Sequence, residues 1–112
     1  MESEEKDAEE KLNQLQLVEQ NLQSFLLQKQ NLQMQLMEVE SALIEVDKTN
    51  SPYKIIGNVM VAAKKDDLKS ELQGRQEMLK LRVSSIEKQE DKLKEKASKI
   101  QSEVLKGMKE KR

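Results

Sequence analysis

The amino-acid sequence predicts a fold dominated by α-helix: a long antiparallel two-helix coiled coil with a central β-hairpin that joins a β-barrel between subunits. Three observations predict it. Apolar residues recur at spacings of three and four over both halves of the chain, which is the pattern of a coiled-coil seam. The one proline, Pro52, interrupts that pattern near the middle. A β-branched run with a central Gly57-Asn58 pair follows it.

The composition limits the kind of core that the chain can build. The 112 residues are 37% charged, 36% hydrophobic and only 2% aromatic, which is typical of long helices rather than of a rounded globule. Burial must therefore come from a thin seam of Leu, Ile and Val. We expect one domain over residues 1–112, divided into a first helix (1–48), a linker (49–52), a hairpin (53–63) and a second helix (66–112).

The first helix carries an apolar seam on one face. Its members are Leu15, Val18, Leu22, Phe25, Leu32, Leu36, Val39, Leu43 and Val46. Lys29 occupies a position in the same series, where it weakens the seam but can help to set its register. Other apolar residues fall beside or outside the seam, so some of this surface should meet another chain or a ligand: Leu12, Leu17, Leu26, Leu27, Met34 and Met37.

The second helix begins near Asp66 or Asp67, whose carboxylates suit the first-turn N–H groups and the positive end of the helix dipole. Its seam has the same spacing but is thinner, because Gln76 and Glu90 occupy two expected core positions. The apolar members are Leu72, Leu79, Val83, Ile86, Leu93, Ala97, Ile100 and Val104.

The two helices have matching lengths, roughly 65 to 70 Å each at a rise of about 1.5 Å per residue, so we expect them to fold back on each other. Charge favours this antiparallel arrangement, because acidic residues predominate over 1–11 and lysines over 92–112. An exposed ion pair contributes typically less than about 1 kcal/mol. The charges therefore select the orientation more than they stabilise it.

The middle of the chain predicts a hairpin. Pro52 lacks a backbone N–H and biases Ser51 away from the helical region, so the first helix should end around 48–50. Residues 53–56 and 59–62 have strand composition, and Gly57-Asn58 suits a two-residue turn with positive φ. In this register Ile56 faces Val59.

Both faces of the predicted hairpin are largely apolar. One face holds Tyr53, Ile55, Met60 and Ala62, and the other holds Lys54, Ile56, Val59 and Val61. A lone two-stranded hairpin is marginal in water and leaves two unpaired edges. A barrel assembled from the hairpins of several chains pairs the edges and covers a face, so we expect an obligate oligomer.

The chain resembles the β-type subunit of prefoldin, a jellyfish-shaped holdase chaperone. The resemblance covers almost the whole sequence: two heptad helices of equal length, "YKIIGNVMV" at 53–61, which matches the family's hairpin, and "LKLRVSSIEKQEDKLKEK" at 79–96, which is similar to its second helix. The single hairpin indicates the β type, because the α type carries two. The short flanks suggest an archaeal or similar origin.

The resemblance implies a heterohexamer of two α-type and four β-type subunits, joined through barrels of hairpins. Family members capture unfolded polypeptides at the helix tips without ATP and pass them to a group II chaperonin. The implied assembly residues are Tyr53, Ile55, Ile56, Gly57, Asn58, Val59, Met60 and Val61. The implied client-binding residues at the tips are Leu12, Leu15, Leu17, Ile100, Val104, Leu105 and Met108.

Other classes of function find little support in the sequence. There is no His and no Cys for general-base or thiol chemistry, and no Gly-rich phosphate loop, so we predict neither an enzyme nor a cofactor or metal site. A net charge of -1 offers no field for nucleic acid, and no apolar run is long enough to cross a membrane. The acidic N-terminus is unlike a secretion signal, so we expect a cytoplasmic protein.

Two alternatives stay open at the level of sequence. The seam residues among the predicted tips, Leu15, Ile100 and Val104, can serve only to close the coiled coil. The whole chain can also be a structural tether or scaffold that oligomerises through its hairpin without binding clients. A basic C-terminal segment, "KGMKEKR", is better explained as a fraying helix end whose lysines suit the helix dipole than as a contact with nucleic acid or the chaperonin.

Overall fold

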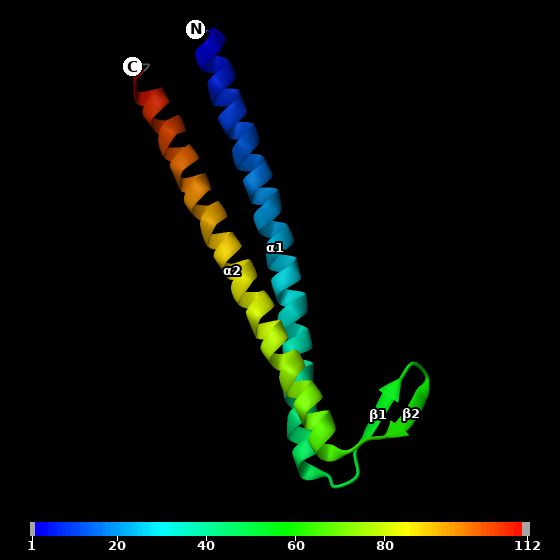
Figure 1. Cartoon of the computed structure of the whole chain (residues 1–112). Coiled ribbons are helices and arrows are strands. Elements are labelled where there is room, and N and C mark those ends of the chain that lie inside the picture. Colours follow the sequence, from blue (N-terminus) through cyan, green and yellow to red (C-terminus); the bar gives the residue numbers. More distant parts are fainter. Residues whose placement is uncertain (1, 111–112) are drawn as a thin grey trace. The chain divides into compact units, whose positions relative to one another are not determined.

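The computed structural model describes residues 2–110 and contains two long helices with a hairpin between them (Figure 1). Helix α1 spans Glu2–Lys48, strand β1 Tyr53–Ile56, strand β2 Val59–Ala62 and helix α2 Lys65–Glu110. The predicted helix ends at residues 1, 111 and 112 lie outside the described residues. The helical fold with its single hairpin is confirmed. The barrel is a property of an assembly of chains.

The chain divides into two compact units, which we describe separately. The terminal unit combines α1 up to Lys29 with α2 from Ser85 onward. The hairpin unit comprises Gln30–Ser84. Over the described residues, neither helix contains a segment apolar enough to cross a membrane.

The terminal unit is held together by the predicted seam. The helices run antiparallel in it, and the beginning of α1 and the end of α2 lie at the same end (Figure 1). Val18, Ile86 and Ile100 are its buried apolar residues, each at a position of the heptad series. The other seam residues are half-buried, as expected for a two-helix contact that covers one side of each helix.

In the hairpin unit the seam buries Val39, Val46 and Leu79. Helix α1 ends at Lys48, four residues before Pro52. Its last carbonyl groups are partly satisfied by local donors: the N–H of Thr49 donates to the carbonyl of Val46 (3.3 Å), and Lys65 Nζ donates to the carbonyl of Asp47 (3.1 Å).

Helix α2 begins at Lys65, one residue before the predicted start at Asp66. The reason is a backbone hydrogen bond: the N–H of Leu68 donates to the carbonyl of Lys64 at 3.0 Å, so Lys64 is the residue that precedes the first helical turn. Asp66 and Asp67 lie in that first turn, where the sequence analysis placed carboxylates.

The hairpin has the predicted register, with Ile56 opposite Val59 and Ile55 opposite Met60. The predicted turn needs one correction. Gly57 has a φ of 60°, but no non-glycine residue among those described has a positive φ, so Asn58 does not. Positive φ at the first central residue alone is the type II′ arrangement, in which only that position requires glycine. Strand β2 ends at Ala62, and Ala63, the last residue of the predicted hairpin range, donates its N–H to the carbonyl of Pro52 at 3.1 Å.

Candidate functional site

The first candidate surface lies at the free ends of the two helices. We call it the tip surface and define it by the predicted residues Leu12, Leu15, Leu17, Ile100, Val104, Leu105 and Met108. All belong to the terminal unit. They lie within the regular helices α1 and α2, so the heptad position of each residue determines the direction of its side chain.

The apolar seam stops before the helix ends. Lys11 stands seven residues before Val18, and Gly107 stands seven residues after Ile100, so both occupy seam positions without supplying a large apolar side chain. A Cβ atom added at Gly107 would meet nothing within 4 Å. Among the described residues, the last layer in which both helices supply a large apolar side chain is therefore made by Leu15 and Val104, both half-buried. Beyond this layer, within the residues that the structure describes, the seam continues only through the small side chain of Ala8, so little apolar burial holds the helix ends together.

The predicted tip residues fall into three groups by burial, of which the half-buried Leu15 and Val104 are one. Ile100 is only 6% exposed and belongs to the seam. Four others are open to solvent, with exposed fractions of 52% for Leu12, 58% for Leu17, 61% for Leu105 and 63% for Met108. These four offer aliphatic and thioether surface that the described residues of the terminal unit leave open to solvent.

Three of the exposed residues lie on one side of the coiled coil. Leu12 and Met108 each stand four residues after a half-buried seam residue, Ala8 and Val104 respectively. Equivalent flanks of two antiparallel helices face the same side, so these two residues share a flank, with Leu105 beside Met108. Leu17 lies on the outer surface of α1, away from this group.

One ion pair joins the two helices near the tip surface. Lys11 Nζ lies 3.7 Å from an Oε atom of Glu103, and both side chains are partly exposed. The polarity is the reverse of the predicted charge pattern, because the lysine comes from the acidic end of α1 and the glutamate from the basic end of α2. At this distance and exposure the pair contributes less than about 1 kcal/mol.

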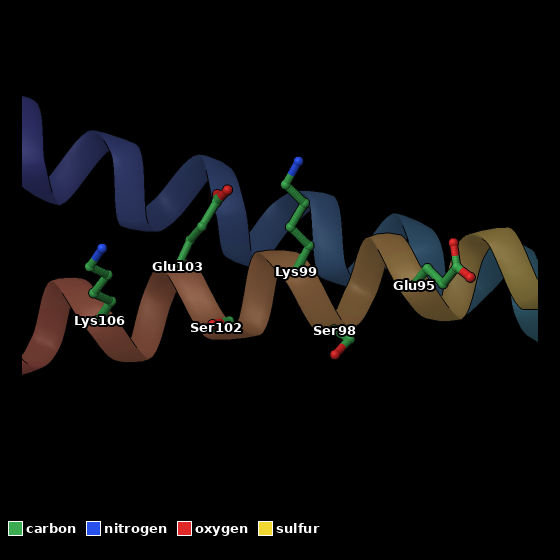
Figure 2. Close-up of a pocket in the computed structure, with 6 residues that line it drawn as sticks. All are labelled: Glu95, Ser98, Lys99, Ser102, Glu103 and Lys106. Carbon is green, nitrogen blue, oxygen red and sulfur yellow. The ribbon is translucent and has the colours of Figure 1, made fainter.

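A shallow hollow lies nearby on α2 (Figure 2). Ser98 and Ser102 are short, so the longer side chains around them stand above the helix surface; Glu103 extends on the side of α1, and Ser98 points away from it. Its lining is polar and charged: Glu95, Ser98, Lys99, Ser102, Glu103 and Lys106. The hollow is open to solvent and contains none of the predicted tip residues.

The second candidate surface is the hairpin itself, residues 53–62, which we call the hairpin surface. Both faces are exposed: Tyr53, Ile55 and Met60 on one face are 61%, 69% and 67% exposed, and Ile56 and Val59 on the other are 58% and 61% exposed. Val61 is the least exposed of the large apolar residues, at 43%. So much apolar surface on two short strands is unusual for a chain that works alone.

Lys54 connects the hairpin surface to α2. Its Nζ atom donates to both carboxylate oxygens of Glu71, at 2.8 and 2.7 Å. The face of the hairpin that contains Lys54 is thus the one on the side of α2. The alternation of strand residues predicts Lys54 on that face. It does not predict the partner, because a separation of 17 residues across a turn and a helix start leaves no periodic signal.

Sequence reasoning also missed a pairing inside the terminal unit. Lys29 and Glu90 were both recognised as polar residues in seam positions, yet Lys29 Nζ lies 2.8 Å from Glu90 Oε1. Glu90 is the buried charged residue of the described chain. The antiparallel fold offered a signal for this pairing. When the seam positions are counted outward from the hairpin along each helix, Lys29 and Glu90 fall at the same level.

Comparison with known proteins adds to this geometry. A family model described as "Prefoldin subunit" matches residues 9–111. The chain is 33% identical to the prefoldin subunit beta of Archaeoglobus fulgidus over 81% of both chains, and 36% identical to that of Pyrobaculum calidifontis over 86% of this chain and 79% of the relative. The crystal structure of the prefoldin beta subunit from Thermococcus strain KS-1 superposes with a TM-score of 0.82 at 33% identity, covering 87% of this chain and 88% of that one.

Proposed function

The chain belongs to the prefoldin family as a β-type subunit, and from this premise we propose that it is part of an ATP-independent holdase that captures unfolded polypeptides. Prefoldin is a family of chaperone subunits, so a role in a complex with other subunits follows from membership. The finer proposal is that the tip surface binds the client and that the hairpin surface joins the subunits. The proposed complex has two α-type and four β-type subunits and acts in the cytoplasm.

The observation that carries the proposal is the exposed apolar group at the free helix ends. Leu12, Leu105 and Met108 share one side of the coiled coil and are more than half exposed. Unfolded polypeptides differ from folded ones in offering apolar side chains, which bind such a surface by the hydrophobic effect. Leu and Met suit varied partners, because the flexible thioether side chain of Met adapts to different shapes.

A single tip of this size binds weakly, and weak binding suits a carrier. Several tips attached to one base raise the effective concentration of the second and later contacts, so the complex retains a client that each tip alone would lose. Release needs no nucleotide, because each contact dissociates independently. We propose that the client then passes to a group II chaperonin.

The experiment compares the assembled complex of this chain and an α-type prefoldin subunit with the same complex carrying Leu12→Ser, Leu105→Ser and Met108→Ser. The readout is light scattering from a chemically denatured protein diluted into buffer without nucleotide. We expect the wild-type complex to suppress aggregation and the triple variant to lose most of that suppression. Mass measurement confirms that both complexes are assembled.

A control variant removes exposed apolar surface elsewhere on α2. Met78 and Leu81 are 53% and 71% exposed and belong to the hairpin unit. The Met78→Ser and Leu81→Ser double variant should protect the client as the wild type does. Equal protection by the tip variant and this control would refute the tip assignment. A wild-type complex that assembles but does not protect would instead favour a structural scaffold.

A further inference from the structure

We propose that the ion pair between Lys54 and Glu71 is a positioning device that sets the orientation of the hairpin on α2 and thereby controls how readily the subunit assembles. The inference rests on the proposed function in two respects, since it takes the hairpin surface as the joint between subunits and counts four β-type chains in the complex. It goes further by assigning a role to Glu71, a helix residue outside the hairpin.

The hairpin has little else to hold it in place. Its apolar side chains are 43% to 69% exposed, so no core packs against either face within the described chain. At its base, Pro52 is buried and its carbonyl accepts a hydrogen bond from the N–H of Ala63. This bond closes the two strands on each other but does not tie them to a helix. In the part of the chain that the structure describes, the side-chain hydrogen bonds from the hairpin to α2 come from Lys54.

The geometry of this contact suits an orienting role. Lys54 is the second residue of β1, and Glu71 lies in the second turn of α2, 17 residues further along the chain. Because Nζ contacts both carboxylate oxygens, at 2.8 and 2.7 Å, rotation of the hairpin about its two connecting segments breaks both contacts together. The pair keeps the Lys54 face on the side of α2 and leaves Tyr53, Ile55 and Met60 directed away from it.

The pair is exposed, with side-chain exposures of 39% and 48%, so it contributes little to the folding of the chain. Its effect lies in the population of hairpin orientations. Exposed ion pairs typically shift an equilibrium by about two- to fivefold. If one orientation is competent for assembly, the apparent affinity falls in proportion to the fraction that occupies it. Four β-type chains in one complex apply this factor four times, so a threefold loss per chain lowers the overall assembly constant by about 80-fold.

The test titrates the full-length chain against a constant amount of an archaeal α-type prefoldin subunit and measures the fraction assembled by mass photometry. Lys54→Met and Glu71→Gln should each raise the concentration at half assembly about threefold. The charge-exchanged double variant, Lys54→Glu with Glu71→Lys, should recover much of the loss, because it restores an opposite pair at the same site. Circular dichroism should show unchanged thermal unfolding for all three.

A second readout follows the hairpin directly. Tyr53 is the one tyrosine of the chain, which has no tryptophan, so intrinsic tyrosine fluorescence reports on the hairpin alone. Fluorescence anisotropy of the unassembled chain should be lower for Lys54→Met than for the wild type, because a released hairpin reorients on the nanosecond timescale. Raising the salt concentration to about 1 M should lower the wild-type value toward that of the variant, since it screens exposed pairs.

The neighbouring ion pair supplies the control. Lys69 Nζ lies 3.0 Å from Asp47 Oδ1 and joins α2 to the end of α1 without touching the hairpin. Lys69→Met should leave both the assembly midpoint and the anisotropy unchanged. Wild-type values for Lys54→Met in both measurements would overturn the proposal. If the wild-type chain does not assemble at all, the proposed function fails, and the anisotropy still decides whether Lys54 holds the hairpin.

Discussion

Lys29 of α1 donates a hydrogen bond of 2.8 Å to the carboxylate of Glu90 on α2, inside the seam of the terminal unit. The side chain of Glu90 is 8% exposed and that of Lys29 is 21% exposed, so the glutamate is buried and the lysine keeps part of its side chain in water. The described chain has no buried side-chain nitrogen or oxygen atom without a hydrogen-bond partner. The pair thus makes a charged residue tolerable where the heptad pattern calls for an aliphatic one.

Removing one partner of this pair should cost more stability than removing both. Lys29→Leu leaves the buried carboxylate of Glu90 without its donor, and Glu90→Leu leaves the ammonium without its acceptor. Both single variants should unfold at lower urea concentration than the wild type. The double Leu variant should be at least as stable as the wild type, because it replaces two charged residues at seam positions with aliphatic ones. Urea unfolding followed by circular dichroism provides the double-mutant cycle; additive effects of the two changes would contradict this account.

The stability of the chain should depend on pH through Lys29. The hydrogen bond to Glu90 raises the pKa of Lys29 above its ordinary value of 10.5; partial burial opposes this, and the charges of Glu90, Glu87 and Asp91 raise the pKa further. Because the pKa of Lys29 is higher in the folded chain than in the unfolded chain, the stabilisation from its ion pair is fully present at pH values below the unfolded-state pKa. It is lost as the pH rises through the folded pKa.

The measurement for this pH dependence is the difference in unfolding free energy between the wild type and Lys29→Met, taken from pH 8 to pH 12 in steps, at about 0.1 M salt. Subtracting the variant removes the contribution of the other lysines, which titrate in the same range. The difference should be constant at the lower end and shrink above the ordinary lysine value. If the difference in unfolding free energy instead grows with pH, the ion pair with Glu90 does not favour the protonated form of Lys29.

Burial in the seam should decide the cost of truncating a leucine on α2. Leu79 is 5% exposed and Leu81 is 71% exposed, and both lie in the same helix of the hairpin unit. Leu79→Ala should destabilise the chain by about 2 to 5 kcal/mol, because it removes buried apolar surface and leaves a cavity. Leu81→Ala should change the unfolding free energy by less than about 0.5 kcal/mol. Equal effects in urea unfolding would place the seam on a different face of α2.

Any side chain at Gly57 should destabilise the hairpin turn. Its φ of +60° is strained for any L-residue, although a Cβ atom would meet nothing within 4 Å. Gly57→Ala should therefore cost about 1 to 2 kcal/mol in the hairpin, through backbone strain alone. The loss should appear as weaker assembly with an α-type subunit. The control is Gly74→Ala, a change within regular helix, which should stabilise the chain by about 0.8 to 1 kcal/mol.

Much of the fold could be predicted because its signals are local. The spacing of Val18 and Val39 within their heptads placed both on the buried side of α1, where the structure has them. The register of Ile56 with Val59 followed from a two-residue turn and alternating strand residues. The φ of Asn58 could not be predicted with certainty from its residue type, because asparagine accepts both signs and the strand twist selects between two hairpin turns.

The tip residues show how far residue spacing predicts which side chains are exposed. A spacing of three and four indicated that Leu12 and Leu105 stand off the seam, and both are exposed. The same reasoning could not separate Ile100 from Val104, because both occupy seam positions in the repeat. Ile100 is buried and Val104 half-buried, because the next seam position after Val104 is Gly107, which has no side chain to cover it.

The sequence by itself determined the two seams, the hairpin between them and the family to which the chain belongs. Periodicity, turn chemistry and motifs depend on residues that are close together along the chain. Only the tertiary structure decided that Lys29 pairs with Glu90 and Lys54 with Glu71. Those contacts join residues 61 and 17 positions apart. Their formation depends on how side chains from different elements pack within each unit. A charge pair needs a distance near 3 Å between its charged atoms, and residue spacing along one strand or helix cannot specify a distance to another element.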